Sequence, residues 1–275
     1  QAGTSVSDMH PIEHLRYVAR ATGADPVSLV HETSQALRGL RHEPAGLVLT
    51  ARRIVERHPT CAPLWWLCAQ VLVAPDPFDR AEELSLELDA DRTTDHLVDA
   101  LPQDAVVCVI GWSPTALEAI ARRGDCSAFV VDSFGTADTA VRVLEQAGCA
   151  AEAVSLEHAA LAVTRSNLVI ADALACGPEM FFASAGSYGV AALAHVESVP
   201  VWLTARKGTR LPNELWLAMH SRNRDADQPW RTEVDEIPLA LCGTFVGPSG
   251  ISHVPADAVR PECPATTEML VRSAM

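Results

Sequence analysis

The stretch from Ser166 to Arg206 reads SNLVIADALACGPEMFFASAGSYGVAALAHVESVPVWLTAR. It begins with a short apolar run, residues 168–170, which has the length of a buried strand. Small and apolar residues at 185–195 predict a buried helix, and the apolar run at 199–203 predicts a second strand. A strand, a helix and another strand in this order form the unit from which parallel sheets are built, so the stretch predicts an α/β fold.

Polar and basic residues follow both of these strands. Asp172 stands where the first strand is expected to end, Gly186 and Ser187 open the helix, and Arg206 and Lys207 follow the second strand. Ligands of open parallel sheets bind beyond the carboxyl ends of the strands, so these residues are candidates for a ligand site. The two basic residues are placed to neutralise a phosphate, although a solvated pair on a loop is the plainer interpretation.

The second half of the chain repeats this alternation, and the first half does not. Residues 10–101 contain five helical patterns and no strand pattern, the last being a long acidic helix that starts at residue 76 or 79 and continues through residue 97. Residues 102–275 alternate, with strands expected at 105–110, 127–131, 151–154 and 237–245, and helices at 136–147, 157–163 and 211–220. We therefore predict a helical N-terminal domain, residues 10–101, and a Rossmann-like parallel-sheet domain, residues 102–275.

The composition narrows the class of protein. A net charge of −14 over 275 residues argues against nucleic-acid binding, which needs a basic surface. No apolar run reaches membrane-spanning length, and no signal-peptide pattern begins the chain, where residues 1–9 resemble a leader or an expression remnant. The eight cysteines form no C-x-x-C pair. We therefore expect reduced thiols in a cytoplasmic protein, with no metal and no cofactor, and no membrane partner.

The stretch that starts at Ser166 resembles part of the initiation factor 2B alpha/beta/delta family. This family includes aldose–ketose isomerases that act on methylthioribose 1-phosphate and ribose 1,5-bisphosphate. Its strand ends Gly-Ala-Asp and its helix opens Asn-Lys-Ile-Gly-Thr, whereas here the strand ends at Ala171-Asp172 and the helix opens at residues 183–187. Ala183 and Ser184 stand in place of the Asn and Lys that hold substrate in the isomerases.

The resemblance implies a NagB/RpiA/CoA-transferase-like fold for what would be a divergent, bacterial-looking member. It also implies a homodimer that pairs through the C-terminal domain. In the isomerases the Asp at position 172 is a general acid/base, whereas an Asp that caps the following turn is the plainer interpretation from the residues alone. Exchange-factor work on a translation GTPase, a further family function, has no support from individual residues.

Gly111, Trp112 and Ser113 form the turn after the first predicted strand of the sheet. Ser113 precedes Pro114, a combination that is typical of a helix N-terminus, and such a terminus either binds an anion or simply starts the helix. In the isomerases a catalytic Cys lies in this turn. The turn here is closer to that of the regulatory subunits, and Cys108 lies inside the strand, where a core thiol is expected.

Four further residues complete the candidate ligand site. Asp132 and Ser133 end the second strand, where they either bind a ribose hydroxyl or cap the next helix. Glu179 lies in the loop after Asp172, and Ser184 lies where the next helix opens.

Two main functions remain open on this evidence. The first is a non-catalytic or regulatory protein that binds a phosphorylated sugar or nucleotide in a cleft between the two domains. The alternative is an aldose–ketose isomerase of a sugar 1-phosphate that uses Asp172. A remote alternative is a serine hydrolase, because residues 185–189 come within one residue of the G-x-S-x-G pattern around Ser187.

Overall fold

A computed structural model describes residues 25–41, 46–223 and 228–271, so the first of the five helical patterns expected in residues 10–101, which includes Ile12, Leu15 and Val18, lies outside the described residues. The chain forms two compact units. Unit 1 contains residues 1–90, 207–224 and 261–275, and unit 2 contains residues 91–206 and 225–260. The boundary expected between residues 101 and 102 would make each domain one continuous segment. In the structure, residues 207–224 and 261–275, which belong to the C-terminal half of the chain, are part of unit 1.

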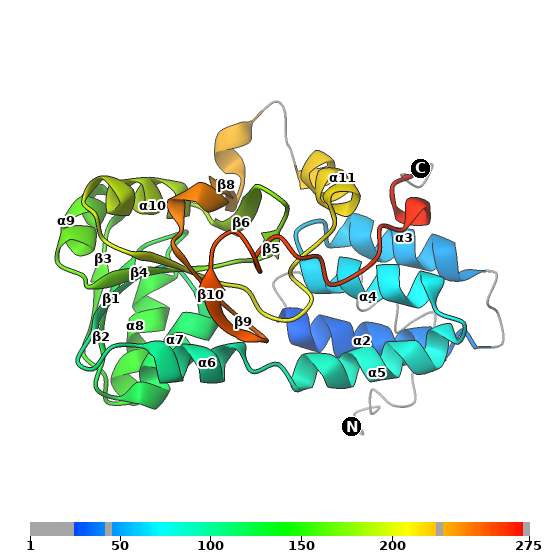
Figure 1. Ribbon diagram of the computed structural model, residues 1–275, viewed down its shortest axis with the longest axis horizontal. Coiled ribbons are helices and arrows are strands. Elements are labelled where there is room, and N and C mark those ends of the chain that lie inside the picture. The colour runs from blue at the N-terminus through cyan, green and yellow to red at the C-terminus, as the bar shows by residue number, and fades with distance from the viewer. Residues whose placement is uncertain (1–24, 42–45, 224–227, 272–275) are drawn as a thin grey trace, which may run out of the picture. The chain divides into compact units, whose positions relative to one another are not determined.

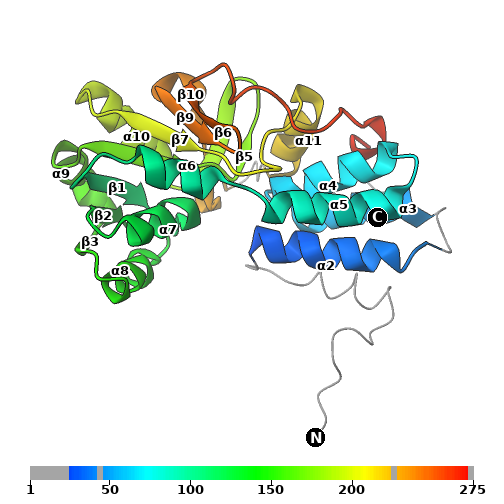
Figure 2. The same ribbon diagram turned by 60° about the horizontal axis from the view of Figure 1, so that its bottom comes forward.

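The described part of unit 1 is helical. Its helices are α2 (Pro26–Arg38), α3 (Leu47–Arg57), α4 (Ala62–Val73), α5 (Pro77–Asp89) and α11 (Asn213–Asn223), with the 3₁₀ turn η6 (Thr267–Met269). Asp25 caps α2 and Asp76 caps α5. In both helices a proline occupies the first helical position, where its missing N–H and its fixed φ favour a helix start. Helix α4 is apolar nearly all round and is buried, while α2 packs beside α5 (Figures 1 and 2).

The long acidic helix expected from residue 76 or 79 through residue 97 is wrong. The chain forms α5 and then, in unit 2, a separate helix α6 (Thr93–Ala100). Asp91 explains the break, because its Oδ1 accepts hydrogen bonds from the Thr93 N–H at 3.1 Å and the Thr93 hydroxyl at 2.7 Å. A side chain that satisfies these free groups starts a new helix.

Two C-terminal segments complete unit 1 through one buried carboxylate. Glu262 accepts a hydrogen bond from the Gly208 N–H at 2.9 Å and pairs with the Arg210 guanidinium at 2.9 Å. The carbonyl of Glu262 accepts from the Trp66 indole at 3.2 Å and from the Gln70 amide at 3.0 Å. These contacts bind residues 207–210 and residue 262 to α4, which is why segments far apart in the sequence share this unit.

Unit 2 is built on a seven-stranded sheet. Its strands are β1 (Val106–Ile110), β2 (Ser127–Val131), β3 (Ala151–Val154), β4 (Leu168–Asp172), β7 (Val201–Thr204), β9 (Thr244–Gly247) and β10 (Gly250–His253). The order is β10-β9-β7-β4-β1-β2-β3, and only the β9–β10 pair is antiparallel. Besides α6, the helices are α7 (Pro114–Arg123), α8 (Ala137–Gln146), α9 (Ala159–Thr164) and α10 (Ser187–Val196). The prediction of a helical N-terminal region followed by a mostly parallel α/β sheet is confirmed.

A second, antiparallel sheet extends unit 2. It contains β5 (Ala175–Cys176), β6 (Met180–Ser184) and β8 (Val234–Pro238), in the order β5-β6-β8. The single strand expected at residues 237–245 is therefore wrong, because β8 ends at Pro238 and β9 begins at Thr244. The two strands pair with β6 and β7, which belong to different sheets.

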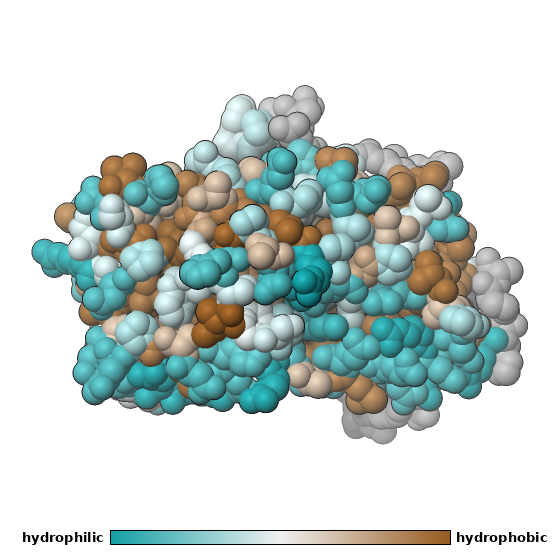
Figure 3. All heavy atoms as spheres, viewed as in Figure 1, coloured by the Kyte–Doolittle hydropathy of each residue, from teal (hydrophilic) through white to brown (hydrophobic). Residues whose placement is uncertain are grey.

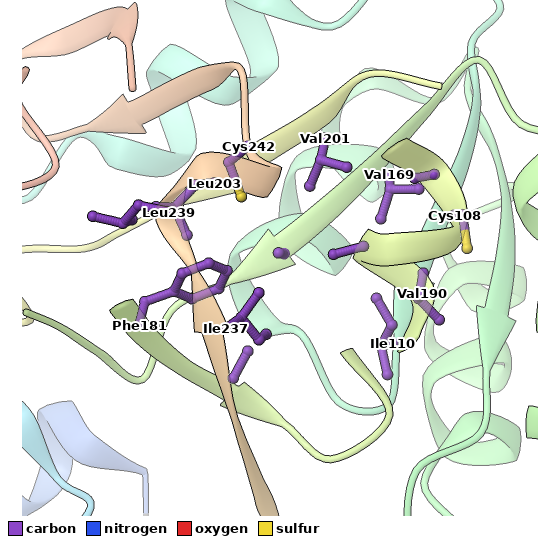
Figure 4. Packing of buried hydrophobic residues seen from close by; sticks show 14 of the residues in the cluster. Cys108, Ile110, Val169, Phe181, Val190, Val201, Leu203, Ile237, Leu239 and Cys242 are labelled. Atoms are coloured by element: carbon purple, nitrogen blue, oxygen red, sulfur yellow. The ribbon is translucent and has the colours of Figure 1, made fainter. Parts of the chain in front are cut away.

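Apolar side chains cover both faces of the larger sheet. On one face, Cys108 and Ile110 of β1 and Val169 of β4 pack with Val190 of α10 (Figure 4). On the other face, alternate residues of the same strands, such as Val107 and Ile170, pack with helices α6, α7 and α8. Burial on both faces explains why these strands are continuous apolar runs rather than alternating ones.

The molecular surface is mixed in character. On the face shown in Figure 3, hydrophilic residues are interspersed with scattered hydrophobic ones. Across the described residues, each helix is too short or too polar to traverse a bilayer.

Candidate functional site

The carboxyl edge of the parallel sheet brings the candidate residues of unit 2 together. Strands β7, β4, β1, β2 and β3 are consecutive neighbours, so the loops that follow them meet at one edge. The Ser133 hydroxyl donates to the carbonyl of Ala185 at 2.8 Å, which joins the loop after β2 to the start of α10. Gly111, at φ +56°, lies so close to Ser133 that an added Cβ would be 2.9 Å from the Cβ of Ser133. Helices α7, α8 and α10 begin at this edge, and α9 begins there after β3 and a short 3₁₀ turn at residues 156–158.

Asp172 caps α7. Its Oδ2 accepts a hydrogen bond from the backbone N–H of Thr115 at 2.9 Å, and its Oδ1 accepts a short hydrogen bond from the hydroxyl of Thr204. Burial raises the pKa of the Asp172 carboxyl, while the hydrogen bonds from Thr204 and Thr115 act in the opposite direction. The carboxylate therefore links β4 to α7 on one side and to β7 on the other.

Ser113 does not cap α7 through its side chain. It occupies the N-cap position, but its hydroxyl donates to the carbonyl of Ile110 at 2.9 Å and accepts no hydrogen bond from the helix. Ser113 therefore occupies the N-cap position, as expected, but its hydroxyl does not accept a hydrogen bond from a helix N–H group. The carboxylate of Asp172 accepts that hydrogen bond instead.

Asp132 caps α8 in the same manner. Its two carboxylate oxygens accept hydrogen bonds from the N–H groups of Gly135 and Ala137, each at 3.0 Å. Of the two roles that the sequence allows for Asp132, the structure shows the capping of the next helix. Phe134, between them, is held at φ +53° with its side chain 64% exposed.

Asp235 caps α10, and the sequence analysis missed it. Its Oδ2 accepts from the N–H of Gly186 at 2.8 Å and from the N–H of Tyr188 at 2.9 Å. Asp235 reaches this position because β8 pairs with β6, which leads into α10. The only signal in the sequence is an acidic residue next to an apolar run, and that signal does not reveal which helix the residue caps.

This architecture is similar to that of known proteins, although the sequence is not. No family model and no curated protein matches the sequence. Among solved structures, translation initiation factor eIF-2B from Pyrococcus horikoshii OT3 superposes with a TM-score of 0.74 at 16% identity, over 90% of this chain and 98% of that one. The chain has the eIF-2B fold.

Two further structures support this assignment. The beta subunit of eIF2B from Chaetomium thermophilum has a TM-score of 0.67 at 15% identity and covers 93% of both chains. The 5-methylthioribose 1-phosphate isomerase from Pyrococcus horikoshii OT3 has a TM-score of 0.65 at 12% identity, over 89% of this chain and 85% of that one. The resemblance drawn from residues 166–206 is therefore confirmed for the fold, which translation initiation factor eIF-2B and an isomerase both have.

The two basic residues after β7 are both engaged by carboxylates in this eIF-2B-like fold. Arg206 pairs through Nε with Asp91 at 3.1 Å, within unit 2. Lys207 pairs with Glu87 at 3.2 Å and lies 5.6 Å from the ring centroid of Trp66, within unit 1. A phosphate that bound either cation would therefore have to compete with a carboxylate of the protein.

Glu179 and Ser184 lie at opposite ends of β6. Ser184 ends the strand two residues before Gly186, whereas Glu179 precedes its first residue and is exposed. A strand of this length spans roughly 15 Å at about 3.4 Å per residue. Ser184 is therefore near the start of α10, and Glu179 is not.

Ser187 is buried at the start of α10, and no histidine among the described residues lies within hydrogen-bonding distance of it. A hydrolase would need the serine on a sharp turn directly after a strand, with a histidine beside it. Nor does any group of three or more His, Cys, Asp or Glu residues in the described ranges have a metal-binding arrangement.

Each of the three helix starts capped by a carboxylate has an exposed aromatic residue within three positions of its first residue. Trp112 follows β1, Phe134 follows β2 and Tyr188 opens α10, with 45%, 64% and 47% of their surfaces exposed. Trp112 and Phe134 follow the neighbouring strands β1 and β2. The hydrogen bond from Ser133 to Ala185 joins the loop that contains Phe134 to the start of α10, where Tyr188 lies. The edge therefore offers aromatic surface and carboxylates, and the starts of α7, α8 and α10 are already capped by carboxylates.

Proposed function

We propose that this protein is a non-catalytic, regulatory protein that binds a nucleotide at the carboxyl edge of the sheet in unit 2. The observation that carries the proposal is the position of Asp172, whose two oxygens are used to hold α7 and β7. A general acid/base must reach the substrate proton within hydrogen-bonding distance. Here both oxygens serve the fold.

The other groups that the isomerases require, according to the family resemblance, also differ. Cys108 lies inside β1, where burial raises its pKa to about 12, so it is neither in the turn nor ionised at neutral pH. Ser184 stands where a lysine would hold substrate. These differences favour binding without turnover.

Aromatic surface favours a nucleotide over a sugar phosphate. Bases stack on the faces of aromatic side chains, with about 1–3 kcal/mol per base, and Trp112, Phe134 and Tyr188 offer such faces. A phosphate at the start of α7, α8 or α10 would have to replace Asp172, Asp132 or Asp235. A ligand that uses its base and leaves its phosphate near solvent avoids that replacement.

The test combines binding and turnover. AMP, adenosine, ribose 1,5-bisphosphate and methylthioribose 1-phosphate are titrated into the pure protein by calorimetry, and isomerisation of the last two is followed by NMR. We expect AMP and adenosine to bind with similar affinity, no isomerisation, and at least about a tenfold loss of affinity in Trp112→Ala. Trp230→Ala, which removes another exposed indole, is the control and should bind normally.

Two results would reject this function. One is isomerisation of either sugar phosphate that disappears in Asp172→Asn. The other is binding of ribose 1,5-bisphosphate that exceeds binding of AMP and is unchanged in Trp112→Ala. The homodimer remains part of the proposal, and light scattering coupled to size-exclusion chromatography measures it.

A further inference from the structure

A groove of about 430 Å³ lies at the free edge of the larger sheet, between β3 and α9. Strand β3 is the last strand of that sheet, and among residues 25–41, 46–223 and 228–271 no further strand pairs with its outer side. The groove is formed entirely within unit 2 and is of the size that small-molecule sites have. The groove is separate from the nucleotide site proposed above, so the inference about the groove does not rest on that proposal.

The floor of the groove is apolar. Phe129 on β2 is paired in register with Glu152 on β3, and Val131 is paired with Val154. Paired residues of parallel strands share a face, so the side chains of Phe129, Glu152 and Val154 stand on the face that α9 covers. Leu161 of α9, 57% exposed, forms the facing wall.

A carboxylate and a guanidinium border the same groove without a partner. Glu152 and Arg165 both line it, and within the described part of the chain neither side chain takes part in an ion pair or a hydrogen bond. Helix α9 follows β3 and runs back toward the edge where the parallel strands begin, so Arg165, directly after α9, lies toward that edge, as does Glu152, the second residue of β3; both line the groove. The two opposite charges therefore lie at one end of the groove.

Polar groups close the other end. The hydroxyl of Ser155 lies 3.0 Å from Nδ1 of His158, and both residues line the groove after β3 ends. The groove thus has two opposite charges at one end, an apolar middle and a small polar pair at the other.

We propose that this groove binds a free α-amino acid with an apolar side chain. The ligand carboxylate would pair with Arg165, its ammonium with Glu152, and its side chain would lie on Phe129, Val154 and Leu161. An α-amino acid carries its two charges on adjacent atoms, which matches two opposite charges at one end of a groove. Arg165 is suited to a carboxylate because a guanidinium binds it through two parallel hydrogen bonds.

The test uses L-leucine and two analogues that each lack one charge, 4-methylpentanoate and isoamylamine, titrated into the full chain. We expect saturable binding of leucine at one site per chain, with each analogue at least about tenfold weaker. Arg165→Gln should weaken leucine by a similar factor and leave isoamylamine unchanged. Glu152→Gln should weaken leucine likewise and leave 4-methylpentanoate unchanged.

Matched controls are Arg142→Gln and Glu145→Gln, which change exposed charges on α8 away from the groove, and both should bind leucine normally. Absence of leucine binding at millimolar concentration overturns the proposal. So does leucine binding that both groove variants leave intact, or equal affinity of the wild-type protein for leucine and isoamylamine. Because AMP binding is measured with Trp112→Ala, loss of either site is seen independently of the other.

Discussion

The carboxylate of Asp235 on β8 accepts a hydrogen bond from the backbone N–H of Gly186 at 2.8 Å, and it thereby starts helix α10 from 49 residues away in the sequence. The same oxygen accepts from Tyr188 at 2.9 Å. Asp172 and Asp132 do the same for α7 and α8. Three of the helices that begin at the carboxyl edge, α7, α8 and α10, are thus capped by carboxylates of the protein itself, in positions where an anion would otherwise bind.

Replacing Asp235 should destabilise the fold. Asp235→Ala removes the acceptor for two helix N–H groups, and loss of such a cap costs about 1–2 kcal/mol in the free energy of unfolding. Asp235→Asn keeps one acceptor oxygen and should cost less. Urea denaturation measures both, with Glu145→Ala, an exposed residue on α8, as a control expected within about 0.5 kcal/mol of the wild type. Equal stability of Asp235→Ala and the control would show that water replaces the cap.

Two glycines with left-handed backbones should respond differently to alanine. Gly111 and Gly124 have φ of +56° and +72°, so both substitutions carry the strain of a left-handed alanine, about 1 kcal/mol. The alanine Cβ at 111 would also lie 2.9 Å from Cβ of Ser133, whereas position 124 has open space. We expect Gly111→Ala to cost about 1–3 kcal/mol more than Gly124→Ala in chemical denaturation. A cost that is the same at both positions contradicts the close approach of the loops after β1 and β2.

The pH dependence of stability should reflect Asp172. Because burial raises its pKa above the ordinary value of 3.8, the native state holds the proton more tightly than the unfolded state does. The stability from this group is therefore fully present below pH 3.8 and is lost as the pH rises through the higher pKa of the folded protein. The Asp172→Asn variant has no titrating group at this position, so its stability lacks this contribution to the pH dependence.

We therefore expect the unfolding free energy of the wild type minus that of Asp172→Asn to decrease as the pH rises from about 4 to 7. Urea denaturation at several pH values measures this difference. An increase over the same range would mean that the hydrogen bonds from Thr115 and Thr204 outweigh burial, and that the pKa of Asp172 is lowered.

The cysteines should be unreactive in the native protein. All eight are free thiols, and seven of them are buried. Burial raises the pKa of Cys68, Cys108, Cys242 and Cys263 to about 12, so few thiolates form at pH 8. We expect 5,5′-dithiobis(2-nitrobenzoate) to modify them slowly at pH 8 and to titrate eight thiols in guanidinium chloride. Rapid native modification of Cys108 would contradict its position inside β1.

The buried pair of Arg210 and Glu262 should be important to unit 1. The two side chains are 9% and 6% exposed, and Glu262 also accepts from the N–H of Gly208. Glu262→Ala leaves the guanidinium buried without this partner, which typically costs about 3–5 kcal/mol. The double variant Arg210→Met/Glu262→Leu should be less destabilised than Glu262→Ala alone, and thermal unfolding measures both. A double variant that is the less stable of the two would mean that packing, rather than the unpaired charge, sets the cost.

Much of the fold follows from local patterns in the sequence. The apolar runs of β1, β2 and β4 are each long enough for one strand, and the Asp-Pro pair at 25 and 26 starts α2 as expected. These patterns depend only on which neighbouring residues face the same side of a helix or strand, so they can be read without knowing any long-range contact. The same reasoning predicted that Asp172 ends a strand, that Gly111 and Asp132 follow strands, and that Gly186 opens a helix.

The order of the strands and the partners of the polar groups depend on tertiary structure. That β4 lies beside β1 places Asp172 against α7, 57 residues earlier in the chain, and that β8 pairs with β6 places Asp235 against α10. The assignment of residues 207–224 and 261–275 to the helical unit likewise rests on long-range contacts such as those of Glu262. Local sequence determined most of the helices and the inner strands of the larger sheet, because propensity and periodicity act over a few residues, but it did not reveal the break between α5 and α6 or the smaller sheet. Only the folded chain decided which carboxylate caps which helix, because a hydrogen bond requires two groups within about 3 Å, however far apart they are in the sequence.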